Sequence, residues 1–185
     1  MDVRRCLGWL GPLSIFLLLH FLIWIAPGVQ ISAFCRPVAL AAASLMPAQL
    51  QEDDLGVPIL SFLDGRASLR IGVTCSGTDF FILSSALGLW LLMRRRDLSP
   101  HLLGAALLVL LPLCYAVTLV INTCRVVAVS GLSPWMEVFL PERALALGHL
   151  SLGVFFFLPC LLAFVFYSER LLHVLRNSAP HSSKI

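Results

Sequence analysis

Charged side chains are scarce in this chain: Asp, Glu, Lys and Arg together account for only 12% of its 185 residues. Hydrophobic residues account for 59%, which is more apolar surface than a soluble domain of this size can bury. The scarcity of charge therefore excludes an ordinary soluble domain and indicates a chain that crosses a membrane several times.

The sequence also lacks the patterns of several common binding sites. It has no basic segment of the kind that follows a nucleic acid. Its six cysteines include no C-x-x-C pair, and its five histidines show no metal-ligand spacing. We therefore predict no nucleic-acid partner, no metal site, no cofactor and no disulfide framework.

Four stretches are long and apolar enough to cross about 30 Å of hydrocarbon as helices: 7–26, 77–93, 101–121 and 144–167. A fifth stretch, 31–50, contains an arginine between two prolines, so it spans, re-enters or lies in the interface. We therefore predict an all-α polytopic membrane protein with four to five transmembrane helices. His20 in the first span is expected to hydrogen-bond a neighbouring helix.

Two connecting segments are polar or rich in turn residues. Residues 51–74 contain the pair Asp64–Gly65 between short runs of alternating apolar residues, which predicts a small hairpin outside the lipid. Residues 126–143 contain Gly131, Pro134 and Pro141, so we expect the helix to be interrupted there and a short amphipathic turn to rest on the bilayer surface.

Lys and Arg cluster near the N-terminus, at 94–96 and after residue 169, and the positive-inside rule assigns such clusters to the cytoplasm. The segments 51–74 and 122–143 then face outward. Whether 31–50 crosses the membrane decides the orientation of the N-terminus, and the sequence leaves that open. We predict one membrane-embedded domain over 1–176 and a disordered cytoplasmic tail at 177–185.

This orientation gives three chemically distinctive side chains the same depth, at the outer face. Cys75 lies at the start of a predicted helix, whose positive end favours a thiolate nucleophile. His149 can take the thiol proton and return it to a leaving amine, and Arg125 can stabilise an oxyanion. The competing interpretations are a small packing cysteine, an interhelical histidine and an arginine that reaches the outer surface.

The motifs "TCSG" at 74–77 and "NTCR" at 122–125, followed by His149 early in the next span, resemble the exosortase/archaeosortase family of multi-pass membrane cysteine transpeptidases. The resemblance covers about residues 37–168. The chain lacks the extra N-terminal spans of the larger members, so it is more similar to the compact exosortase K type.

The resemblance implies a cysteine protease and transpeptidase that cleaves C-terminal sorting signals through a thioacyl intermediate. Cys75 would be the nucleophile, His149 the acid and base, and Arg125 the group that stabilises the oxyanion or positions the substrate. Four further residues are expected to support the site: Asn122, Asp79, Ser76 and Gly77. Asp79 departs from the family pattern, which has a neutral residue there, and we expect it to pair with Arg125 rather than to oppose thiolate formation.

The implied partners are exported proteins that end in a signal motif, an apolar span and a basic tail. Membrane lipid surrounds the enzyme, and a polysaccharide-associated group is one candidate acyl acceptor. The implied location is the cytoplasmic (inner) membrane, with the site on the extracytoplasmic face. Two other interpretations stay open: a transport or channel subunit with ionisable groups along its path, and a non-catalytic component of exopolysaccharide assembly. Both would tolerate Cys75→Ala.

Overall fold

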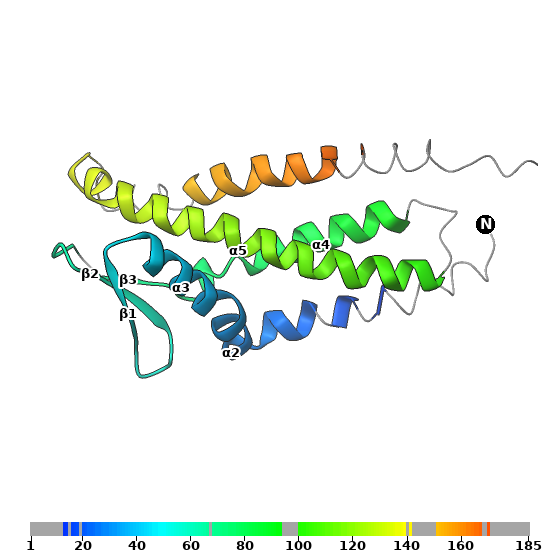
Figure 1. The fold of residues 1–185 in the computed structure, drawn as a ribbon, viewed down its shortest axis with the longest axis horizontal. Helices are drawn as coiled ribbons and strands as arrows, with labels where there is room; N and C mark the ends of the chain where they lie inside the picture. The colour runs from blue at the N-terminus through cyan, green and yellow to red at the C-terminus, as the bar shows by residue number, and fades with distance from the viewer. Residues whose placement is uncertain are drawn as a thin grey trace, which may run out of the picture.

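The computed structural model describes residues 13–14, 16–18, 20–66, 68–93, 100–139, 141, 151–167 and 170. These residues are mostly helical and form a bundle with a small sheet at one end (Figure 1). Two helices are long and apolar enough to cross a membrane by length and composition, Pro27–Leu45 and Gly104–Met136. Shorter apolar helices cover Phe16–Ile25, Thr78–Leu92 and Ser151–Tyr167. The predicted tail at 177–185 lies outside the described residues.

The N-terminal helices are separated by a break at Ala26. Its backbone leaves the helical region (φ −110°, ψ 85°) because Pro27 follows and disfavours a helical conformation in the preceding residue. After the break the chain continues through α2 (Pro27–Gln30), a π-helical turn η1 (Ile31–Cys35) and α3 (Arg36–Leu45). The helix before the break and the segment from α2 to α3 after it both run toward the sheet in Figure 1. Most of the stretch 31–50 therefore belongs to the candidate span Pro27–Leu45, and its crossing of the membrane stays a prediction.

Three antiparallel strands form the sheet, in the order β1 (Ala48–Glu52), β2 (Pro58–Phe62) and β3 (Leu69–Arg70). The predicted hairpin is confirmed, because β2 pairs with β3 on either side of Asp64–Gly65. Gly65 takes a φ of 80°, which favours glycine. The all-α description was wrong in this respect. In particular β1 was missed, because its residues were assigned to the stretch 31–50.

The helix α5 (Pro100–Phe139) contains 40 residues and includes both Pro112 and Pro134. The predicted interruption of the segment 126–143 is therefore wrong up to Phe139. Pro134 has no N–H to bond the carbonyl of Ser130 four residues earlier. Arg66 of the β2–β3 hairpin replaces that donor, since its Nη1 lies 3.0 Å from the Ser130 oxygen. A contact from outside the helix thus satisfies the carbonyl that the proline leaves free.

The main core cluster joins α3, the sheet and α5, and its buried members are Cys35, Val38, Ala39, Ala42, Leu60, Ile71 and Val126. A second contact links the N-terminal helix to α4 (Thr78–Met93): His20 Nε2 lies 2.8 Å from Ser85 Oγ. The expectation that His20 bonds a neighbouring helix is confirmed.

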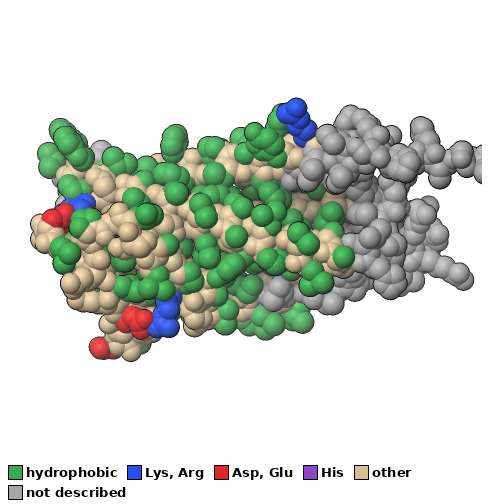
Figure 2. Space-filling view, in the orientation of Figure 1, with side chains coloured by type: hydrophobic (Ala, Val, Ile, Leu, Met, Phe, Trp, Pro, Cys, Tyr) green, Lys and Arg blue, Asp and Glu red, His purple; other side chains and the backbone are tan. Residues whose placement is uncertain are grey.

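Charge and apolar surface are segregated along the molecule. On the face shown in Figure 2, charged side chains lie over the sheet and at the far end of the last helix. The band between them carries hydrophobic and uncharged groups. Among the hydrophobic residues of α5, Leu108, Val109 and Val120 are strongly exposed. Such a band fits contact with lipid better than contact with water.

Candidate functional site

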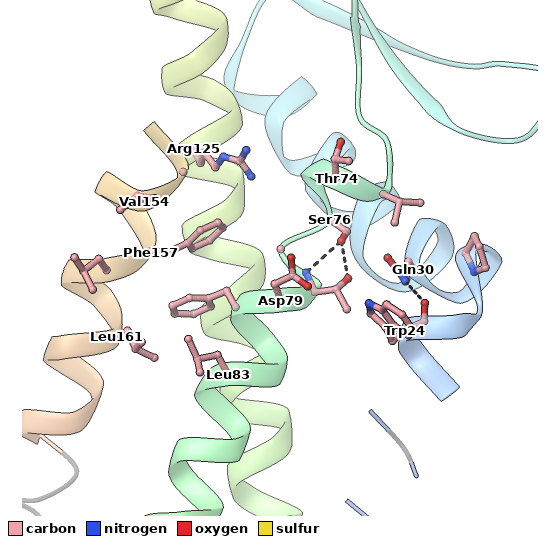
Figure 3. Close-up of a pocket in the computed structure, with 17 residues that line it drawn as sticks. Trp24, Gln30, Thr74, Ser76, Asp79, Leu83, Arg125, Val154, Phe157 and Leu161 are labelled. Carbon is pink, nitrogen blue, oxygen red and sulfur yellow. Dashed lines mark hydrogen bonds between the residues drawn. The ribbon is translucent and has the colours of Figure 1, made fainter. Parts of the chain in front are cut away.

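A cavity of about 690 Å³ lies between the start of α4, the middle of α5, the break at Ala26 and the helix Ser151–Tyr167. Figure 3 shows its lining. Polar groups from the turn before α4, together with Gln30 and Arg125, line one part of the cavity. Leu83, Phe157 and Leu161 line the other. The cavity can therefore hold a ligand that has both a polar and an apolar part.

The turn before α4 is built by short-range contacts that require small residues. It consists of the 3₁₀ turn η2 (Val73–Cys75), Ser76 and Gly77. Ser76 Oγ accepts a hydrogen bond from the Thr78 backbone N–H at 3.2 Å and so helps to start α4. Gly77 has a φ of 74°, and a Cβ there would lie 3.2 Å from side-chain atoms of Asn122 and Thr118. Ser76 and Gly77 thus shape the turn that carries Cys75.

Asn122 joins the two motif segments. It is completely buried on α5, and its Nδ2 donates a hydrogen bond to the backbone carbonyl of Cys75. Its Oδ1 is buried and has no partner within the described part of the chain. The close approach of Gly77 to the Asn122 side chain fixes the turn against α5. "TCSG" and "NTCR" are therefore in direct contact.

Arg125 lies one helical turn after Asn122, and its side chain lines the cavity. Its guanidinium carbon lies 5.6 Å from the centre of the Phe157 ring, within reach of a cation–π attraction. Gly153 leaves room for this side chain, because a Cβ there would come within 3.4 Å of Arg125 Nε. A cation is thus held at the cavity wall by an aromatic ring.

The expected pairing of Asp79 with Arg125 is not formed. Both residues line the cavity, but the ion pairs found among the described residues join Arg36 to Glu52, Arg66 to Asp64, and Arg70 to Asp53. Asp79 occupies the first turn of α4 and is exposed.

The Cys75 side chain faces away from the cavity. It is partly buried and packs against the core cluster that contains Cys35. In the run 73–80 every residue except Cys75 lines the cavity. The structure therefore brings Cys75 next to the cavity wall, but its thiol does not share the open space with Arg125 in this conformation.

The third predicted catalytic residue, His149, lies outside the described residues, and its position stays a prediction. Gly153, four residues later in the sequence, lines the cavity beside the Arg125 side chain.

Sequence reasoning missed the wall formed by Trp24 and Gln30. The signal that could have revealed it is Pro27 within an apolar run, followed by a glutamine three residues later.

No protein-family model, curated protein or solved structure matches the chain.

Proposed function

We propose that the chain is a multi-pass membrane cysteine transpeptidase that cleaves the C-terminal sorting signals of exported, membrane-anchored proteins. One observation carries the proposal. The hydrogen bond from Asn122 to the Cys75 carbonyl joins two motifs 47 residues apart, and Arg125, one turn further, lines the cavity that the Cys75 turn also lines. A thiol next to the wall of a substrate-sized cavity that holds a cation suits acyl transfer.

In the proposed reaction the Cys75 sulfur attacks the scissile carbonyl carbon while His149 accepts the thiol proton. Arg125 stabilises the negative oxygen of the tetrahedral intermediate. The C–N bond then breaks, and the proton passes from His149 to the leaving amine. An acceptor amine or hydroxyl then attacks the thioester carbon while His149 takes its proton, and the C–S bond breaks as that proton returns to the Cys75 sulfur. The mechanism requires the thiol to turn from the core cluster to the cavity, a movement within the short 3₁₀ turn between Gly72 and Gly77.

The proposed enzyme lies in the cytoplasmic membrane with the sheet outside. The Met93 end of α4, the Pro100 end of α5 and the Tyr167 end of the last helix lie opposite the sheet in Figure 1. Three arginines follow Met93 in the sequence, and the positive-inside rule assigns that end to the cytoplasm. A helix of 40 residues is about 60 Å long, so α5 extends well beyond about 30 Å of hydrocarbon. Arg125 would then lie in its outer half.

The test is processing of a co-expressed exported protein that ends in a candidate motif, an apolar span and a basic tail. We expect Cys75→Ala to abolish processing at normal membrane abundance, and Arg125→Ala and His149→Ala to reduce it by at least about a hundredfold. Cys124→Ala is the matched control, because Cys124 is an exposed cysteine adjacent to Arg125. Unchanged processing by Cys75→Ala would refute the proposal.

A further inference from the structure

Gln30 is a buried polar residue beside the helix break. It is only 4% exposed and lines the cavity. Its Nε2 donates to two backbone carbonyls at the end of the preceding helix, those of Ile23 at 3.1 Å and Trp24 at 2.9 Å. Pro27 has no N–H to bond the Ile23 carbonyl four residues earlier. The Gln30 amide therefore supplies a donor that the break removes.

These two contacts determine how the amide is oriented. A carbonyl oxygen only accepts hydrogen bonds, so the NH₂ group must face the two carbonyls and both of its hydrogens are used. The Oε1 atom then faces the opposite way. None of the hydrogen bonds described for Gln30 uses Oε1, and Figure 3 shows that this oxygen points into the cavity. An almost fully buried side chain thus presents a free acceptor to the cavity.

The polar groups of the cavity select for a ligand with both donors and acceptors. Arg125 can only donate, whereas Gln30 Oε1 can only accept. A lipid phosphate offers acceptors alone, so it would leave Gln30 Oε1 without a donor. A peptide backbone carries a donor and an acceptor at each residue. The apolar part of the cavity, with Leu83 and Phe157, can receive the peptide's apolar side chains.

We infer that Gln30 is a substrate-binding residue whose Oε1 accepts a hydrogen bond from a backbone N–H of an extended peptide in the cavity. This inference rests on the proposed function, in which the substrate is a peptide. It adds that the cavity wall with Gln30 binds the peptide backbone. The peptide lies between α2 on one side and the Cys75 turn with Arg125 on the other. Its apolar continuation passes along α4 and the last helix.

The test uses the full chain carrying Cys75→Ala, in detergent micelles, and a fluorescent synthetic peptide with a serine- and glycine-rich half joined to an oligoleucine half. A second set of probes replaces each backbone amide in turn with an ester, which removes a single N–H. We expect one ester position to weaken binding by about tenfold, as for the loss of one hydrogen bond. Gln30→Met should weaken binding of the all-amide peptide by a similar factor and abolish the penalty at that ester position.

Two further variants separate binding from folding. Gln30→Lys keeps donors for the Ile23 and Trp24 carbonyls but has no acceptor, so it should fold and still lose the affinity. Gln49→Met is the matched control, because Gln49 lies exposed on β1, and it should bind as tightly as the parent.

The inference is overturned by an absence of peptide binding to the parent, by unchanged affinity in Gln30→Lys, or by an ester penalty that persists in Gln30→Met. It is also overturned if phosphatidylglycerol binds in the cavity and the peptide does not. Processing that fails while the Gln30-dependent binding persists would remove the transpeptidase proposal and leave a peptide-binding site. Normal processing without any Gln30 dependence would remove only this inference.

Discussion

The contact between the hairpin and α5 leads to a quantitative prediction. Arg66→Ala removes the donor to the Ser130 carbonyl, and Pro134 prevents the helix from replacing it. Ser130 is only 4% exposed. A buried carbonyl without a partner costs about 1–3 kcal/mol. We expect the lower part of that range, about 1–2 kcal/mol, because the Arg66 side chain that covers the carbonyl is itself 32% exposed, so its removal admits water. For a chain of this size that corresponds to a fall of about 2–8 °C in the midpoint of thermal unfolding.

A double-mutant cycle isolates this contribution. Pro134→Ala restores an N–H at residue 134, so the helix itself can bond the Ser130 carbonyl. In the Pro134→Ala background Arg66→Ala should therefore cost much less, and the coupling free energy should be about 1 kcal/mol or more. The assay is thermal unfolding of the four proteins in detergent micelles. Arg70→Ala is the control, since Arg70 is exposed and pairs with Asp53 of the β1–β2 connection. An equal effect of Arg66→Ala in both backgrounds would refute the reasoning.

Three further predictions concern the turn, the sheet and the helix contact. Gly77→Ala should lower the free energy of unfolding by about 1–3 kcal/mol because of its positive φ, whereas Gly72→Ala, with open space around it, should change the same unfolding midpoint little. Backbone N–H groups, that of Val57 foremost, hold the pKa of Asp53 below its ordinary value. The stability that the Asp53 carboxylate contributes is therefore complete above the ordinary pKa near 4. It is lost as pH falls through the lowered pKa. Amide hydrogen exchange in the sheet should show that loss, and Asp53→Asn should remove it. Ser85→Ala deletes the bond to His20 and should cost about 0.6–1 kcal/mol in thermal unfolding.

The sequence predicted those features that depend on local pattern. Apolar length indicated the helical segments, and the pair Asp64–Gly65 between alternating residues indicated the hairpin. The alternation of apolar and polar residues in 48–52 also indicates a strand. We did not predict β1 because the apolar stretch 31–50 was extended into its first three residues. The continuity of α5 could not be predicted, because the donor that compensates for Pro134 lies 64 residues away in the hairpin.

The candidate site, like the fold, was predicted from the sequence only in part. The order of the motifs indicated that the segment with Asn122 and Arg125 lies near the turn that bears Cys75. In the structure Asn122 bonds that turn, and Arg125 lines the same cavity as the turn. The direction of the Cys75 side chain depends on the conformation of a three-residue 3₁₀ turn, which spacing does not encode. The missing ion pair of Asp79 reflects the same limit: two residues can share a cavity wall while their charged groups point to different parts of it.

The contact between Arg66 and Ser130 also has a consequence for biosynthesis. Translation proceeds from the N-terminus, so the hairpin leaves the ribosome before the second half of α5 is made. Arg66 is therefore already available when Pro134 leaves the Ser130 carbonyl without its donor. A delayed or mispaired hairpin would let this helix bend or end early while the chain folds. We therefore expect that loss of the small sheet would first be detected as increased degradation of newly made chains.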